Sequence, residues 1–345
     1  MALPATAPRP RASEAADAAG WDGPVPTLHD VYRARQVVQR YLPPTPMLNP
    51  AALSARLGAD VYVKCENLQP TGAFKVRGGV NLLSRLSDEE LARGVVTAST
   101  GNHGQSIAFA AGLFGAKATI FVPEVANPLK VDAMRRLGAE VVFVGRDFDE
   151  CREAAGRHAE DTGAYFVHSA NEPHLIAGVA TYVLEILDAV PDLDTLIVPV
   201  GGGSGLAGAC LVGKAINPTL RVVGVGAEGA PAVRDSWRRR ELLAYDRADT
   251  DAEGVATRVA FALPSSIIWD AVDDIALVSD AEMRRATLTL LETTRLLAEG
   301  AGAAALAAAR QLRDTLSGQK VGVVLSGGNL TLDGLRRALA EETPW

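Results

Sequence analysis

The segment TGAFKVRGG places one lysine, Lys75, between an aromatic residue and a glycine-rich turn. An uncharged lysine amine is a nucleophile toward aldehydes and a base toward acidic C–H bonds. Most lysines are solvated surface cations, however, so the residue type alone does not indicate chemistry. The role of Lys75 therefore depends on the groups that the fold brings next to it.

A glycine loop follows the apolar run TLIVPV, and the helical segment GLAGACLVGKA follows the loop. Backbone N–H groups at a helix start bind phosphate well when no side chain stands in the way. Five glycines within residues 201–208 exceed what a tight turn needs, which favours a phosphate site. Gly203, Gly205 and Gly208 also spell GxGxxG, and Glu228 ends the next apolar run, so a nicotinamide dinucleotide is the alternative.

Two further polar turns follow apolar runs. Ser99 to His103, in VVTASTGNHGQ, opens a helix with hydroxyl and N–H groups that suit a carboxylate, although simple helix capping is the alternative. Ser326 begins the turn SGGN, whose glycines admit a flat ligand. A phosphate loop, a lysine and these turns together fit pyridoxal 5'-phosphate (PLP), because its aldehyde reacts with a lysine amine. A nicotinamide dinucleotide needs no such lysine.

The elements that position these groups are apolar, β-rich runs that alternate with helical segments from residue 94 onward. Runs that are apolar on both faces and separated by helices predict parallel sheets covered on both sides, which is an α/β fold. Ligands of such folds bind at the carboxyl ends of the strands. Each of the three polar turns stands at such an end.

Composition excludes several classes of function. The 345 residues carry a net charge of -7, which argues against nucleic-acid and anionic-membrane partners. Three single cysteines predict reduced thiols in a cytoplasmic protein. The five histidines have no zinc-binding spacing, so we expect no metal. No apolar run of about 20 residues predicts a membrane span.

Five segments stand in the order found in one known family: KCENLQPTGAFKVRGG, STGNHGQ, VPVGGGSGLAGA, AEGAGAAALAA and SGGN. Over about residues 28–340 the chain resembles the serine/threonine dehydratase and serine racemase family, which are fold-type II, tryptophan-synthase-β-like PLP enzymes. The resemblance implies two three-layer domains, each with a parallel sheet, and the cofactor in the cleft between them. It implies a large domain of residues 27–93 and 172–345, a small domain of 94–171 and a homodimer. We expect residues 1–26 to form a flexible tail.

The resemblance also implies roles for single residues. Lys75 would be the Schiff-base lysine and, once the substrate amine displaces it, the general base. Ser326 would face the pyridine nitrogen as a neutral partner, which favours prompt loss of a β-substituent. The further cofactor contacts would be Phe74, Asn102, Gly201, Gly202, Gly203, Ser204, Gly205, Gly254 and Glu299. The substrate carboxylate would lie against Ser99, Thr100, Gly101, Asn102 and His103.

The implied activity is that of an ammonia-lyase, which converts L-threonine or L-serine to a 2-oxo acid and ammonia. Thr100 is a second catalytic candidate, because serine racemases carry a serine acid/base at this position and threonine-type dehydratases commonly carry alanine. An amino-acid racemase is therefore an alternative. A catalytically silent PLP-binding protein is disfavoured by the intact lysine and GNHGQ.

Three departures from the family pattern matter. Ser169 follows His168 where the family more often has proline, which leaves open a bulkier β-hydroxy amino acid as the substrate. Arg234 stands six residues after Glu228, where relatives with a divalent-cation site have aspartate, so such a site is not expected. Only 15 residues follow Leu330, which argues against feedback control through an appended regulatory domain.

Overall fold

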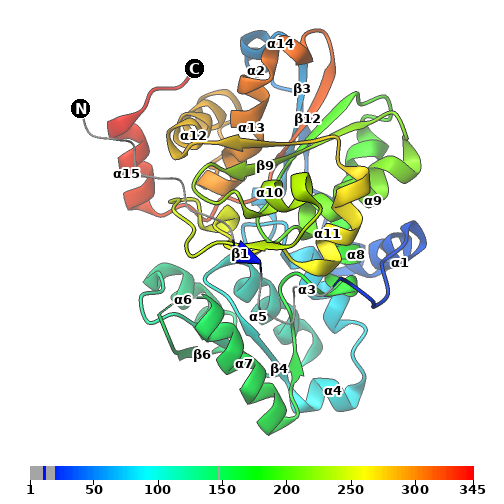
Figure 1. Cartoon of the computed structure of the whole chain (residues 1–345), viewed down its shortest axis with the longest axis vertical. Coiled ribbons are helices and arrows are strands. Elements are labelled where there is room, and N and C mark those ends of the chain that lie inside the picture. Colours follow the sequence, from blue (N-terminus) through cyan, green and yellow to red (C-terminus); the bar gives the residue numbers. More distant parts are fainter. Residues whose placement is uncertain (1–10, 13–19, 147) are drawn as a thin grey trace.

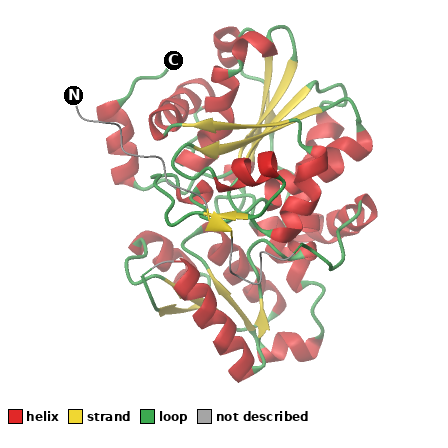
Figure 2. Ribbon diagram, viewed as in Figure 1, coloured by secondary structure: helices red, strands yellow, loops and turns green. Residues whose placement is uncertain are grey.

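The computed structural model describes residues 11–12, 20–146 and 148–345 of the chain. It has two bodies, each built on one sheet with helices on both sides (Figures 1 and 2). Most of the tail predicted for residues 1–26 lies outside the described residues. Within it, Arg11–Ala12 (β1) pair antiparallel with Leu243–Ala244 (β10).

The larger sheet has six strands in the order β11-β9-β8-β12-β3-β2. All neighbouring pairs are parallel except β2 with β3, which is antiparallel. The strand bounds are Met47–Leu48 (β2), Asp60–Cys65 (β3), Thr195–Pro199 (β8), Arg221–Ala227 (β9), Asp274–Val278 (β11) and Lys320–Leu325 (β12). The parallel sheet that the apolar runs predicted is confirmed.

Helices cover both faces of the larger sheet because its central strands are apolar on both faces. In β8, Leu196 and Val198 join one hydrophobic core, and Ile197 between them joins the other. The first core takes in Leu28–Tyr41 (α1), Pro173–Ala189 (α8), Ser204–Ile216 (α9) and Ala262–Ala271 (α11). The second takes in Ala51–Leu57 (α2), Asp280–Thr294 (α12) and Gly300–Gln311 (α13). Ala232–Arg239 (α10) contributes Val233 to the first core, and Arg313–Leu316 (α14) contributes Leu316 to the second. Leu332–Glu341 (α15) packs against α12.

The smaller sheet has four parallel strands in the order β6-β5-β4-β7. Their bounds are Val95–Ala98 (β4), Ala118–Val122 (β5), Glu140–Phe143 (β6) and Tyr165–Phe166 (β7). Asn102–Phe114 (α5) and Pro128–Arg136 (α6) cover one face, and Phe148–Thr162 (α7) covers the other. All four strands fall within the predicted small domain, while the domain boundaries themselves stay a prediction.

One helix links the two bodies and carries the candidate lysine. Val76–Leu83 (α3) begins directly after Lys75 and packs against both α5 and α8. Its buried residues Val76 and Val80 belong to the same hydrophobic core as Ile107 of α5. The start of α3 is therefore held between the large and the small body. The remaining short helix, Asp88–Arg93 (α4), leads into β4.

Among the residues that the structure describes, no helix is both long and apolar enough to cross a membrane.

Candidate active site

A cavity of about 370 Å³ lies at the carboxyl ends of β8 and β12 of the larger sheet and β4 of the smaller one. It is the place where the three polar turns of the sequence meet. Every residue that the sequence assigned to a site lines it: Phe74, Lys75, Ser99, Thr100, Gly101, Asn102, His103, Gly201, Gly202, Gly203, Ser204, Gly205, Gly254, Glu299 and Ser326. The fold brings all of them together, whereas their individual roles stay predictions.

Lys75 is half-buried, and its amine has a neutral partner. Its Nζ donates to Ser204 Oγ at 3.1 Å and lies 5.4 Å from the centre of the Phe74 ring. Within the described part of the chain Lys75 forms no ion pair, and burial lowers its pKa to about 8. An amine with this pKa is uncharged at neutral pH far more often than an ordinary lysine, which suits a nucleophile or a base.

The backbone around Lys75 is fixed by the turn after β12. Phe74 N–H donates to Ser326 O at 3.0 Å, and Ala73 forms an antiparallel bridge with Gly327. The Ser106 hydroxyl of α5 donates to Lys75 O at 2.7 Å. The lysine is thus anchored from the large body and from the small one, which limits the directions its side chain can take.

The glycine loop after β8 forms a cradle that side chains would fill. A Cβ added at Gly201 would lie 2.2 Å from Gly254 O, far inside van der Waals contact. Gly203 caps α9 with a φ of 98°, a backbone conformation that favours glycine. The first N–H groups of α9 have no partner within the helix, so they are available to an anion. The loop has the geometry of a phosphate site.

The turn after β4 combines helix capping with an open face. Ser99 Oγ accepts from Gly101 N–H at 3.1 Å and from Gly104 N–H at 2.8 Å, so this side chain caps α5. Thr100 lines the cavity, and its hydroxyl makes no hydrogen bond to any residue the structure describes. Helix capping therefore explains the role of the Ser99 side chain. It does not explain Thr100, whose hydroxyl is available to a ligand.

His103 is buried and uncharged. Burial lowers its pKa well below the ordinary value, and the charges of Lys75 and His168 lower it further. Thr97 Oγ1 donates to Val167 O at 2.8 Å, so its oxygen accepts from His103 Nε2 at 3.0 Å. The proton of the ring therefore sits on Nε2, and His103 has no proton to give to a substrate at neutral pH.

Two amides and one carboxyl group form a chain of hydrogen bonds along another side of the cavity. Asn102 Nδ2 donates to Glu299 Oε1 at 2.6 Å, and Asn329 Nδ2 donates to Asn102 Oδ1 at 2.8 Å. Burial raises the pKa of Glu299 despite opposing effects of Lys130 and Asn102. These contacts fix the orientation of the Asn102 amide. Ser326, with a hydroxyl 3.5 Å from Ala301 O, lies nearby at the end of β12.

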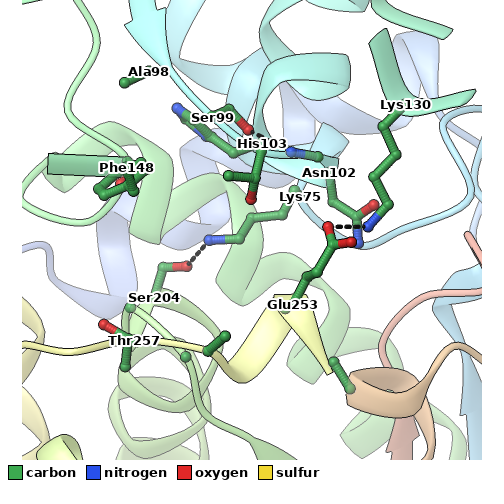
Figure 3. Close-up of a pocket in the computed structure, with 18 of the residues that line it drawn as sticks. Lys75, Ala98, Ser99, Asn102, His103, Lys130, Phe148, Ser204, Glu253 and Thr257 are labelled. Carbon is green, nitrogen blue, oxygen red and sulfur yellow. Dashed lines mark hydrogen bonds and ion pairs between the residues drawn. The ribbon is translucent and has the colours of Figure 1, made fainter. Parts of the chain in front are cut away.

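The sequence did not single out several residues of the cavity. The most notable are Lys130 and Glu253, which form an ion pair across it (Figure 3). Asn127, Phe148, Thr257, Arg258 and Phe261 also line it. Lys130 lies within a helical segment where lysines are usually solvated, so residue type and spacing carried no signal.

Within the described residues, no three or more His, Cys, Asp or Glu side chains are grouped to hold a metal ion. Near the candidate cation position, Arg234 pairs with its neighbour Asp235 at 2.7 Å. The Tyr245 hydroxyl also donates to Asp235. Asp235 is therefore engaged with protein partners.

The residues present fit one kind of ligand. An uncharged amine suits an aldehyde, and the cradle of Gly201 and Gly203 suits a phosphate. The small residues Gly254 and Ser326 line the same cavity, which suits a flat ring. PLP combines these three groups.

Comparison with known proteins gives consistent results. Residues 38–327 match the family described as "Pyridoxal-phosphate dependent enzyme". An L-threonine ammonia-lyase of Thermotoga maritima is 41% identical over 313 residues, which are 91% of this chain and 78% of that protein. The L-threo-3-hydroxyaspartate ammonia-lyase of Saccharomyces cerevisiae is 38% identical over 309 residues, 89% of this chain and 94% of that one. Maize serine racemase superposes with a TM-score of 0.87 at 31% identity, covering 92% of this chain and 98% of its own.

Proposed function

The chain belongs to the family of pyridoxal-phosphate dependent enzymes, and from this premise we propose that it is an ammonia-lyase acting on a β-hydroxy L-amino acid. L-Threonine or L-serine is the substrate, and a 2-oxo acid and ammonia are the products. The similarity to L-threonine ammonia-lyases of 41% and 43% identity supports this assignment. The family excludes the nicotinamide-dinucleotide interpretation of the glycine loop.

The observation that carries the proposal is the Lys75 amine beside the glycine cradle, whose hydrogen-bond partner within the described chain is the neutral Ser204 hydroxyl. In this proposal Lys75 binds the cofactor aldehyde, and Gly201 to Gly205 hold its phosphate at the start of α9. The residues that would hold its ring are Phe74, Asn102, Gly254, Glu299 and Ser326, which all line the cavity. Bound PLP supplies the electron sink that makes the α-proton of the substrate acidic.

Lys75 then acts at the α-carbon of the substrate. With substrate and cofactor bound, Lys75 Nζ would take the α-proton as general base. A pKa lowered to about 8 by burial keeps a useful fraction of this amine uncharged at neutral pH.

The turn after β4 binds the α-carboxylate in this proposal. Thr100, Gly101, Asn102 and His103 lie at the N-terminus of α5, where the helix dipole favours an anion. Ser99 keeps this turn in shape through its two backbone hydrogen bonds. His103 is not the acid that protonates the leaving hydroxyl, because its ring is neutral and its only N–H is used by Thr97.

A racemase is the second candidate, and the free Thr100 hydroxyl is the observation that favours it. Similar proteins named serine racemase, one from rice at 34% identity, agree with this possibility. In a racemase of this kind, the Thr100 hydroxyl would return a proton to the α-carbon. We favour a binding role, in which Thr100→Ala leaves elimination largely intact. Loss of racemisation alone in this variant would identify an acid/base.

One assay distinguishes the candidates. The purified holoenzyme is incubated with L-threonine, L-serine, L-threo-3-hydroxyaspartate and bulkier β-hydroxy amino acids. Formation of 2-oxo acid and ammonia supports elimination, and the preferred compound identifies the side chain. Inversion at the α-carbon without 2-oxo acid would support the racemase, and a colourless protein without bound cofactor would contradict both.

The resemblance further leads us to expect a homodimer in the cytoplasm. Light scattering of the purified protein measures the assembly state, and a monomer at working concentration would contradict the expectation.

A further inference from the structure

A second lysine lies in the same cavity, and the proposed reaction gives it no task. Lys130 belongs to α6 of the small body, and its side chain reaches toward Glu253 of the large body (Figure 3). Lys130 Nζ and Glu253 Oε2 are 2.6 Å apart, and the two side chains are 9% and 42% exposed. The ammonium is therefore nearly enclosed, while its carboxylate partner stays in contact with solvent.

Lys130 lies directly against the turn after β4. A Cβ added at Gly101 would be 3.1 Å from Lys130 Cδ and 3.2 Å from Lys130 Nζ. Gly101 caps α5, whose N-terminus carries a partial positive charge. The ammonium and the helix terminus thus place positive charge at one point, and a carboxylate bound there meets both.

Glu253 connects this turn to the opposite wall of the cavity. It immediately precedes Gly254, whose carbonyl lies against Gly201 of the glycine loop. The ion pair therefore keeps the ammonium beside Gly101 and ties the small body to the wall that would face the cofactor. The charge of Lys130 also acts on the buried Glu299, opposing the rise in its pKa that burial causes.

We propose that Lys130 is a positioning residue for the α-carboxylate of the substrate and that Glu253 holds its ammonium at the Gly101 turn. The inference rests on the proposed function, because an amino-acid substrate brings this carboxylate to the turn. Such an attraction acts on the bound substrate and on the transition state alike. Its loss therefore raises KM and leaves kcat nearly unchanged.

The kinetic test uses the holoenzyme with L-threonine. We expect Lys130→Met to raise KM about tenfold, the effect of losing one charge-assisted contact, with kcat within about threefold of wild type. Lys130→Arg keeps the charge and should keep KM within about twofold. Lys117→Met is the matched control, because Lys117 pairs with Glu140 at 2.7 Å in the same body but is exposed. A KM in Lys130→Met that stays within twofold of wild type would overturn the proposal.

Exchanging the two charges distinguishes a residue that positions the substrate carboxylate from an ion pair that only joins the two bodies. The double variant Lys130→Glu with Glu253→Lys keeps an ion pair between the bodies but puts a carboxylate beside Gly101. We expect its KM to stay raised, because the new charge repels the substrate carboxylate. If the exchange restores the wild-type KM, the pair is only a structural bridge and the proposal is wrong. The visible absorbance of the bound cofactor checks that each variant is folded.

Binding distinguishes failure of this inference from failure of the proposed reaction. Calorimetry gives the Kd of L-alanine, which has no β-hydroxyl to lose, and of L-alaninamide, which has no carboxylate. Lys130→Met, or Lys130→Gln if that variant fails to fold, should weaken L-alanine about tenfold and L-alaninamide less than twofold. If the protein shows this binding pattern but forms no 2-oxo acid, the role of Lys130 is supported and the proposed ammonia-lyase activity is wrong. Equal weakening of both ligands would overturn the inference.

Discussion

Lys75 and Arg77 stand two residues apart at the start of α3, yet their surroundings are opposite. Arg77 is fully buried, whereas Lys75 is half-buried. Arg77 donates to Glu66 at 2.7 and 2.9 Å and to Glu185 at 2.7 and 2.8 Å. Among the residues that the structure describes, the Lys75 amine has one hydrogen-bond partner, the Ser204 hydroxyl. One side of the helix start holds paired charges, and the other holds an amine without a counter-charge.

The two sites show what a partner does to a buried cation. Burial alone would lower the pKa of Arg77, but the charges and hydrogen bonds of Glu66 and Glu185 outweigh it and raise the pKa. Burial acts unopposed on Lys75 and lowers its pKa to about 8. The paired site holds the helix in place, and the unpaired one supplies a reactive amine.

The largest expected effect comes from removing the amine. Lys75→Met should lower the rate of 2-oxo acid formation from L-threonine at least about 10³-fold, because the general base is lost. The unfolding midpoint of the apoprotein should stay near that of the wild-type apoprotein, since no ion pair is broken. Steady-state kinetics and thermal unfolding measure the two quantities. A variant that keeps a tenth of the wild-type activity would contradict the assignment of Lys75 as the general base.

Removing Arg77 should do the reverse and act mainly on stability. Arg77→Met leaves Glu66 and Glu185 without their guanidinium partner, which should lower the free energy of unfolding by about 3–5 kcal/mol. Arg77→Lys keeps the charge but not the paired hydrogen bonds and should lose less. Denaturant unfolding measures both variants. Arg93→Met is the control, because Arg93 forms an exposed ion pair with Glu89. A loss no larger than that of this control would contradict the assignment of a structural role.

The lowered pKa of Lys75 predicts how cofactor capture depends on pH. Only the uncharged amine reacts with an aldehyde, so the rate at which the apoprotein takes up PLP should rise about tenfold per pH unit below 8. The rate should level off above about pH 8, because the amine is then mostly neutral. Stopped-flow absorbance follows the uptake. A rise that continues to pH 10 would mean that Lys75 titrates like an exposed lysine.

The smallest effect is expected from the partner of Lys75. Ser204→Ala removes one neutral hydrogen bond, worth about 0.5–1.5 kcal/mol, and should slow cofactor capture by no more than about tenfold. The pH at which the rate levels off should hardly move, because a hydroxyl carries no charge. A shift of that pH by a full unit would show that Ser204 does more than orient the amine.

The sequence predicted the fold well because the information was local. The runs TLIVPV and KVGVVL are apolar on both faces, and a strand of that kind fits only a covered parallel sheet. The glycines of 201–208 and the turns at Ser99 and Ser326 stand at strand ends, so the parallel topology alone brings them to one edge of each sheet.

The ion pairs could not be predicted in the same way. Lys130 and Glu253 are 123 positions apart, and Arg77 and Glu185 are 108 apart. Each pair joins different elements, and each member looks like an ordinary charged residue of a helix or turn. Which charges meet depends on how the two bodies and α8 pack around α3, and that packing follows no local pattern.

The most direct test of the account asks which amine holds the cofactor. Borohydride reduction fixes PLP to the lysine that carries it, and mass spectrometry of the digested holoenzyme identifies the modified peptide. The account predicts the added mass on Lys75, the amine without a counter-charge. Added mass on Lys130, or no modified lysine at all, would contradict it.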